Sequence, residues 1–226
     1  MDPSSSRRRR DFHGGEDPRT PLLPPATRDW AALPYDVLLA ILSRLRQAAV
    51  LRGAGLTCTS WRWIALKEPM LWRHIDMAIE EGWSFQEECA RRAMARVAVE
   101  RSAGRCESYC GPADCDFLAY LATRSPSLRN LHITSYFQLH GKEMIPKLPM
   151  LERFVISSGE VTPGMLCVLL YHSPHLEQLD AGSCWRMRRG GLVELSVVRT
   201  RLERAVKTLK LPPPDRTFIP LEILFP

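Results

Sequence analysis

The feature that most constrains this fold is a short apolar pattern that recurs in the second half of the chain. An apolar residue, two variable residues, an apolar residue, one variable residue and an apolar residue occur three times: Leu128, Leu131, Ile133; Leu151, Phe154, Ile156; and Leu176, Leu179, Ala181. The first leucines are 23 and 25 residues apart, and a proline precedes each by two positions, namely Pro126, Pro149 and Pro174. Self-similarity at such a period indicates stacked structural units, each buried by its neighbours.

The stretches between these patterns have helical character, at Asp116–Thr123, Gly141–Lys147 and Pro163–His172. The pattern of each unit therefore predicts a helix, a turn and a strand. The period and pattern are those of leucine-rich repeats, which predicts a short leucine-rich-repeat βα solenoid over residues 101–185. An earlier and degenerate strand is indicated at Cys106, Tyr109 and Gly111.

The residues after the last pattern predict a closing element. From Leu192 to Leu209 the apolar residues follow a helical stripe, which Pro212 ends. We expect residues 186–226 to supply a helix that caps the open end of the repeat core, followed by a tail.

The variable positions of each strand are candidates for contact with a partner. Successive side chains of a strand point to opposite faces, so the residues beside the buried leucines lie on the other, concave face. This reasoning nominates Asn130, His132, Arg153, Val155, Gln178 and Asp180 for binding a protein substrate. The alternative for each of them is a solvated strand position without a ligand.

The N-terminal part divides into a leader and a helical segment. Residues 1–27 combine serines, prolines and the Arg7–Arg10 run, a composition typical of disorder. The arginines suit a nuclear-import signal, a phosphate-binding patch or a solvated tail. From residue 28 to residue 77, apolar residues at helical spacing predict three short helices: a first containing Val37, Leu38, Ile41, Leu42 and Leu45, a second with Val50 and Leu51, and a third from about Ser60 to before Pro69.

This segment resembles an F-box. The opening Leu33-Pro34-Tyr35-Asp36-Val37-Leu38-Leu39-Ala40-Ile41-Leu42-Ser43-Arg44-Leu45 is followed at the family's distance by Cys58-Thr59-Ser60-Trp61-Arg62-Trp63-Ile64-Ala65 and then Pro69-Met70-Leu71-Trp72. Asp36 departs from the Glu that the family more often carries. Together with the repeats, the chain is similar to plant F-box/LRR proteins described as Skp-interacting partners.

The resemblance implies a fold, a function and a set of contacts. The expected fold is α+β, with a three-helix F-box at residues 28–77, a linker helix at residues 78–100 and the repeats. The implied role is substrate recognition in an SCF (Skp–cullin–F-box) ubiquitin ligase, with a Skp-type adaptor joining the chain to a cullin and a RING subunit. Adaptor contact would come from Leu33, Pro34, Ile41, Leu42, Leu45, Val50 and Leu51, and Cys58, Trp61 and Trp72 would hold the segment together. The alternatives are that these residues form only a core, and that the chain is a leucine-rich-repeat scaffold without a ligase.

Other functional classes find little support. No apolar run approaches the roughly 20 residues of a membrane-spanning helix, and seven scattered cysteines are typical of reduced thiols in the cytosol or nucleus. We therefore expect a nuclear or cytoplasmic protein. The net charge of +6 is concentrated in Arg7–Arg10 and near Trp185, at Arg186, Arg188 and Arg189, so we do not expect nucleic-acid binding.

We expect no catalytic residue, no cofactor and no metal. The chain has no Gly-rich phosphate loop, no G-x-S-x-G and no H-E-x-x-H motif. The best metal candidates are two loose sets, Cys106, Cys110 and Cys115, and His172, His175 and Cys184. Their spacing differs from the paired cysteines of common zinc sites, so we interpret them as core thiols and repeat-turn histidines.

Overall fold

The computed structural model describes residues 29–78, 85–137, 145–187, 192–212 and 217–218. By its contacts the chain divides into residues 1–30 and residues 31–226. The elements discussed below belong to the second unit, apart from the short 3-10 helix η1 (Trp30–Ala32), which spans the boundary. The predicted leader, with its arginine run, and the cations Arg188 and Arg189 lie outside the described residues.

The N-terminal elements of the second unit form a helical hook, as predicted. Its helices are α1 (Tyr35–Leu42), α2 (Gln47–Arg52) and α3 (Thr59–Lys67), with 3-10 helices η2 (Ala54–Leu56) and η3 (Pro69–Trp72). Helix α3 ends at Lys67 because Glu68 precedes a proline and is extended (φ −102°, ψ 97°). Leu38, Leu42, Val50 and Ile64 form the inside of the hook.

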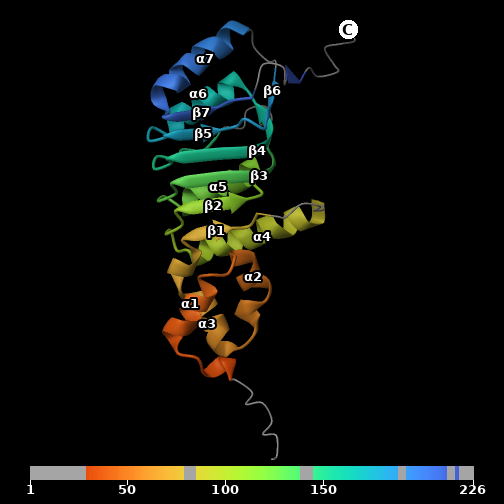
Figure 1. Cartoon of the computed structure of the whole chain (residues 1–226), viewed down its shortest axis with the longest axis vertical. Coiled ribbons are helices and arrows are strands. Elements are labelled where there is room, and N and C mark those ends of the chain that lie inside the picture. Colours follow the sequence, from red (N-terminus) through yellow and green to blue (C-terminus); the bar gives the residue numbers. More distant parts are fainter. Residues whose placement is uncertain (1–28, 79–84, 138–144, 188–191, 213–216, 219–226) are drawn as a thin grey trace, which may run out of the picture. The chain divides into compact units, whose positions relative to one another are not determined.

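A parallel sheet follows, and its main path has the order β1-β2-β3-β4-β5-β7 (Figure 1). Its strands are β1 (His74–Asp76), β2 (Ser108–Gly111), β3 (Asn130–Phe137), β4 (Arg153–Val161), β5 (Gln178–Asp180) and β7 (Thr208–Lys210). The far end of β4 also pairs with β6 (Trp185–Met187), which pairs with β8 (Thr217–Phe218). From β1 to β5, strands that follow each other in sequence are thus neighbours in space.

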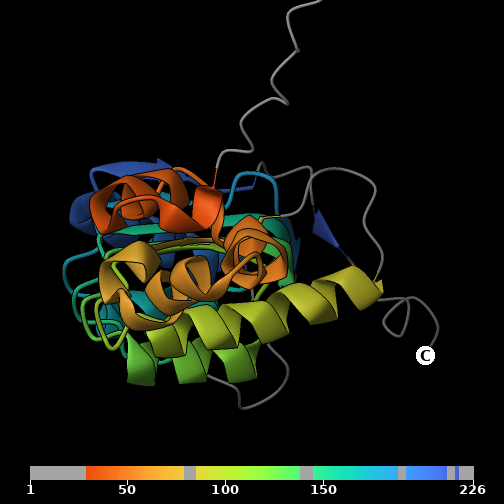
Figure 2. The same cartoon turned by 90° about the horizontal axis from the view of Figure 1, so that it is seen from below.

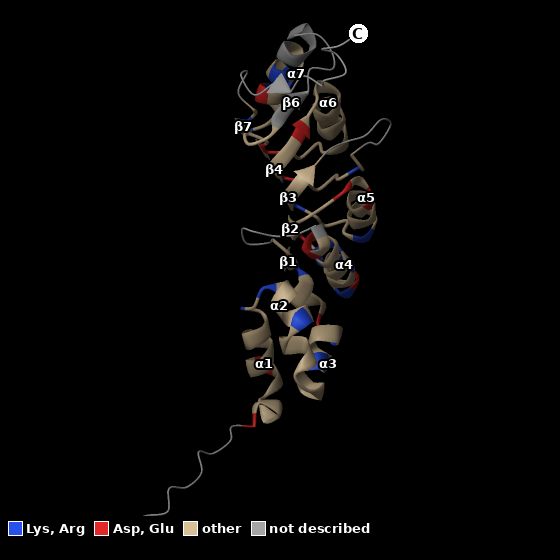
Figure 3. Ribbon diagram, turned by 90° about the vertical axis from the view of Figure 1, so that its right-hand side faces the viewer, with Lys and Arg blue, Asp and Glu red and all other residues tan. Residues whose placement is uncertain are grey.

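Helices connect the strands and cover one face of the sheet (Figure 3). They are α4 (Phe85–Arg101), α5 (Cys115–Arg124), α6 (Pro163–His172) and α7 (Leu192–Ala205). Asp114 and Thr162 cap α5 and α6 by accepting hydrogen bonds from the backbone N–H groups of Phe117 and Met165. Helices α4 and α5 lie side by side (Figure 2).

The strands are in register, so the repeated apolar positions stack into one core. The middle residue of each pattern faces its counterpart on the next strand, in the row Ile75, Tyr109, Leu131, Phe154, Leu179, Leu209. The three patterned strands and the degenerate one at Cys106, Tyr109 and Gly111 are therefore confirmed as strands.

Two predicted helices differ from the elements of the structure. The predicted C-terminal helix stops at Ala205, and Leu209 lies in strand β7 beside β5, so the prediction of a continuous helix to Leu209 was wrong. Val206, Leu209 and Leu211 repeat the apolar pattern, and pairing with β5 packs Leu209 against the core. Of the helix predicted at Gly141–Lys147, residues 141–144 lie outside the described residues, and Ile145–Lys147 are not helical.

The first strand belongs to a segment that the sequence assigned to the hook. Trp72, Ile75 and Met77 follow the same apolar pattern and are fully buried. The N–H of Met77 donates to the carbonyl of Cys110, which continues the pairing of β1 with β2. The hook therefore runs directly into the sheet and shares its core.

Candidate functional site

The side chains that point away from the helices form what we call the open face of the sheet. They lie in two rows across the strands: His74, Ser108, Asn130, Arg153, Gln178 and Thr208, and then Asp76, Cys110, His132, Val155, Asp180 and Lys210. All six residues nominated for substrate contact fall in these rows, on the adjacent strands β3, β4 and β5. The structure brings them together, and their binding of a substrate stays a prediction.

Most charges of the open face are paired within the chain. Asp180 accepts a hydrogen bond from the Lys210 ammonium at 2.9 Å. Burial alone would raise the pKa of Asp180, but the bonds from Lys210 and from the Gly182 N–H outweigh it and lower that pKa. Arg153, by contrast, makes no ion pair with another described residue.

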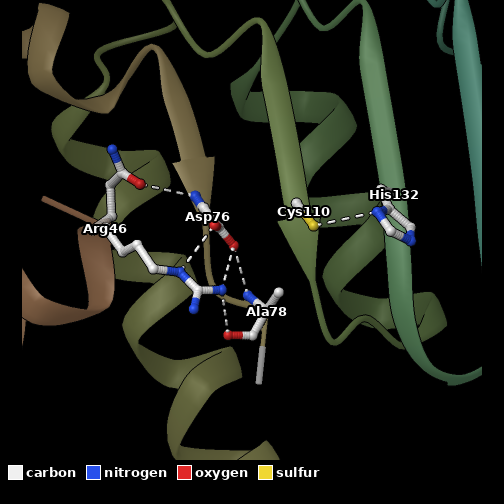
Figure 4. A network of polar contacts seen from close by, with 6 residues as sticks. Arg46, Asp76, Ala78, Cys110 and His132 are labelled. Carbon is white, nitrogen blue, oxygen red and sulfur yellow. Dashed lines mark hydrogen bonds and ion pairs between the residues drawn. The ribbon is translucent and has the colours of Figure 1, made fainter. Parts of the chain in front are cut away.

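A thiol and an imidazole lie in contact on neighbouring strands. The Cys110 Sγ is 3.3 Å from His132 Nδ1, and His132 Nε2 is 2.7 Å from the Ser157 hydroxyl (Figure 4 shows the first contact). Burial raises the pKa of the Cys110 thiol to about 11, and burial together with Arg153 lowers the pKa of His132. The thiol is therefore protonated at neutral pH, which is unsuited to nucleophilic catalysis.

The metal candidates of the sequence are engaged elsewhere. Cys106 Sγ lies 3.5 Å from the Ser108 carbonyl, and Cys184 Sγ lies 3.6 Å from the Ile156 carbonyl. Among the described residues, no group of three or more His, Cys, Asp or Glu side chains is placed to hold a metal ion. Within the same ranges, no helix has the length and apolar content needed to cross a bilayer.

Besides the two rows of the open face, a row of charged residues lies along the edge of the sheet where the strands begin. The residue after each first apolar position is charged, and cross-strand ion pairs join Arg73 to Glu107, Arg129 to Glu152 and Lys207 to Glu177. The hydrogen bond from Arg73 and the nearby cations lower the pKa of Glu107. These pairs reinforce the stacking of adjacent units, although each is partly exposed and contributes modestly.

The lowered pKa values of Glu107 and Asp180 predict a dependence of stability on pH. A carboxyl group whose pKa is lower in the folded chain adds stability above its unfolded pKa and loses it as the pH falls. We expect the double variant Glu107→Gln/Asp180→Asn to be about 1 kcal/mol less stable than the wild type at pH 7, with a smaller difference at pH 3. Urea denaturation at both pH values measures this. Equal differences at the two pH values would contradict the assignment.

The hook and the sheet are joined by a network of polar contacts (Figure 4). The Arg46 guanidinium binds Asp76 with both ends, at 3.0 and 3.3 Å, and also donates to the Ala78 carbonyl at 3.0 Å. The buried Gln47 side chain accepts from the Asp76 N–H at 2.9 Å and donates to the Leu71 carbonyl. Because these contacts connect the start of α2 with β1, they fix the hook against the first strand.

Comparisons with known proteins agree with this architecture. The family model described as F-box-like matches residues 30–78, the hook together with β1. The chain is 35% identical over 131 residues to "F-box protein SKIP19" of Arabidopsis thaliana, covering 55% of this chain and 42% of that protein. It is 28% identical over 189 residues to "Putative F-box/LRR-repeat protein 9" of the same plant, covering 76% and 73%. Residues 30–78 are therefore an F-box-like segment, and the chain is similar to plant F-box and F-box/LRR-repeat proteins.

The coverage of these relatives varies. "Putative F-box/LRR-repeat protein 22", also of Arabidopsis thaliana, is 29% identical over 164 residues, which are 70% of this chain and 52% of that protein. The chain thus spans about half the length of the first relatives it matches. The segment that matches the F-box-like model includes β1. The F-box and the sheet therefore share this strand in sequence, and they also share one hydrophobic core.

The predicted adaptor contacts of the F-box differ in exposure. Pro34 is exposed, and Leu33, Ile41, Leu45 and Leu51 are half-buried. Leu42 and Val50 are 0% exposed, so in this conformation they support the core and their side chains cannot reach a partner. Pro34 stands at the N-cap of α1, and its hydrocarbon side chain has no group that could cap the helix.

Sequence reasoning missed an exposed aromatic pair on the F-box. Tyr35 at the start of α1 and Trp63 on α3 are 46% and 57% exposed, with their rings 6.2 Å apart edge to face. The Tyr35 hydroxyl donates to Glu68 at 2.6 Å, which holds the ring in place. Trp63 could have been found, because it stands two positions from the inward-facing Trp61 and so points to another side of the helix.

Proposed function

We propose that this chain is the substrate-recognition subunit of an SCF-type ubiquitin ligase. The F-box binds a Skp-type adaptor, which links the chain to a cullin and a RING subunit. The sheet is a leucine-rich-repeat solenoid whose open face holds a protein substrate. The chain itself is non-catalytic, takes no cofactor and acts in the nucleus or cytoplasm.

The observation that supports this proposal most is that the F-box packs directly against a sheet whose strands are in register and leave one face open. The F-box displays exposed apolar side chains, including Tyr35, Trp63 and Met70, of the kind that form the centre of protein interfaces. The Arg46–Asp76 contact and the shared burial of Trp72 hold the F-box against the sheet. A substrate on the open face would then be presented to the ubiquitin-loaded enzyme at high effective concentration.

The adaptor half of the proposal predicts the effect of removing the Leu-Pro step. In a pulldown of the full chain with a recombinant Skp-type adaptor, the double variant Leu33→Ala/Pro34→Ala should bind at least about tenfold more weakly than the wild type, a loss of about 1.4 kcal/mol. Leu33 is half-buried and Pro34 is exposed, so the variant should keep its fold, which circular dichroism checks.

Tyr171→Ala provides the matched control. Tyr171 is 82% exposed on α6, so its truncation removes comparable surface far along the sequence from the F-box and should leave adaptor binding unchanged. If the folded wild type does not bind the adaptor, the ligase function is wrong and the chain is a repeat scaffold. If both variants weaken binding equally, the Leu-Pro step is not the anchor.

A further inference from the structure

Among the lysines and arginines that the structure describes on the open face, one makes no ion pair, and it lies at the centre of the first row. Arg153 on β4 is exposed, and its Cα partners on the adjoining strands are Asn130 of β3 and Gln178 of β5. Neighbouring parallel strands lie about 4.8 Å apart, so an amide, a guanidinium and a second amide stand side by side. None of these three side chains makes a hydrogen bond or ion pair with another residue in the described part of the chain.

The other charged residues of the face are held in ion pairs, whereas Arg153 makes no ion pair and only lies near enough to Asp180 to help lower the pKa of that carboxyl. Asp76 is bound by Arg46, and Asp180 is bound by Lys210. At the strand edge beside the row, Arg129 pairs with Glu152 and Lys207 pairs with Glu177. A single unmatched positive charge therefore remains near the middle of the sheet, with amide donors on both sides.

We propose that Asn130, Arg153 and Gln178 form a cradle for a carboxylate, the side chain of an Asp or Glu residue in the bound protein. This inference rests on the proposed role of the open face as the substrate surface. The guanidinium supplies two parallel N–H donors to one carboxylate, and each flanking amide can donate a further hydrogen bond to its oxygens. The substrate class is thus a protein segment with an acidic anchor residue.

The surrounding charges favour a carboxylate over a phosphate. Phosphate-binding sites on proteins gather several arginines, because a phosphate carries close to two negative charges at neutral pH. Here one guanidinium acts alone, and two paired acids lie near it: Glu152 directly precedes β4, and Asp180 lies on the neighbouring strand β5. A monoanion matches the single charge, whereas a dianion would leave charge uncompensated near these carboxylates.

The test measures how charge changes in a set of synthetic peptides, and at Arg153, alter the affinity of the chain for the peptides. Short synthetic peptides are prepared in matched sets, in which an acidic residue is replaced by its amide, by lysine or by phosphoserine, and are bound to the purified full chain. We expect the wild type to bind the acidic peptides with roughly tenfold higher affinity than the matched peptides that carry the amide. Arg153→Gln should abolish the preference, and Arg153→Glu should reverse it toward the lysine peptides.

Arg199→Gln serves as the control, because it makes the same change on helix α7, where Arg199 pairs with Glu203. Absence of an acidic preference, its persistence in Arg153→Gln, or a stronger preference for phosphoserine would each overturn the carboxylate cradle. Adaptor binding is measured on the same proteins. Loss of adaptor binding by the wild type removes the ligase function but leaves the peptide result intact, so the two failures are distinguishable.

Discussion

Replacing Trp72 by alanine should lower the free energy of unfolding by about 4 kcal/mol. Trp72 is 0% exposed, its Nε1 donates to the Ala65 carbonyl at 3.1 Å, and the Arg101 guanidinium lies 5.2 Å from its ring centre. The variant leaves a cavity where F-box, α4 and sheet meet and removes the donor to a backbone carbonyl. Urea denaturation followed by far-ultraviolet circular dichroism measures the change without relying on tryptophan fluorescence.

Trp63→Ala is the matched control within the same F-box. Its ring is mostly exposed and contacts Tyr35, so its removal should cost less than about 1 kcal/mol of stability. We also expect Trp63→Ala to weaken adaptor binding while the chain stays folded. A loss of less than about 1 kcal/mol for Trp72→Ala, or equal losses for both variants, would show that Trp72 does not join the two parts.

Gly159→Ala should also be strongly destabilising, by about 3 kcal/mol. Gly159 has φ +144°, and a Cβ there would collide with the Phe137 carbonyl and lie 2.8 Å from the Phe137 nitrogen. At this point β3 carries one extra residue, since Ile133 faces Ile156 but Tyr136 faces Ser158. At Gly159 the backbones of β3 and β4 approach too closely to leave room for a side chain. In the alanine variant, the pairing of β3 with β4 beyond the bulge must therefore break.

Gly164→Ala tests whether the effect is local. A Cβ at Gly164 meets nothing within 4 Å in the first turn of α6, so stability should stay constant or rise by up to about 1 kcal/mol. Both variants are compared by urea denaturation. A Gly159→Ala protein as stable as Gly164→Ala would mean that β3 and β4 do not pair beyond the bulge as described.

The sequence predicted the strands whose spacing is regular and missed those whose spacing is long. Leu128, Leu151 and Leu176 begin strands 23 and 25 residues apart, so their pattern is visible as a repeat. The apolar pattern around β1 starts at Trp72, 34 residues before Cys106, because α4 is long. Val206 follows Leu176 by 30 residues, with α7 between them. Helical periodicity across Leu202 and Val206 also concealed the turn from α7 into β7.

The candidate site was predictable only where strand alternation determines it. Alternation placed Asn130, His132 and Arg153 on one face, and the register confirms this placement. The Arg46–Asp76 contact joins residues 30 positions apart through tertiary packing, so no local pattern signals it. The bond from the Tyr136 hydroxyl to Glu160 depends on the bulge in β3, which sequence spacing does not reveal.

The coupling of F-box and sheet matters for the proposed function because a ligase must hold its substrate at a defined place. A flexible joint would spread the substrate over a large volume and lower its effective concentration. The bidentate Arg46–Asp76 pair, with Gln47 bonded to both Leu71 and Asp76, opposes such motion. The proposed function therefore places adaptor and substrate on separate surfaces of one compact unit.

Hydroxyl-radical footprinting of the full chain, with and without a recombinant Skp-type adaptor, tests this division most directly. Radicals modify exposed aromatic and sulfur-containing side chains, and the chain carries such reporters on both surfaces. They are Tyr35, Trp63 and Met70 on the F-box, and the half-exposed Tyr136 of β3, which strand alternation places on the same side of the sheet as His132. We expect the adaptor to protect the F-box reporters and to leave Tyr136 as reactive as in the free chain. Protection of Tyr136, or binding without any change at Tyr35 and Trp63, would contradict this division.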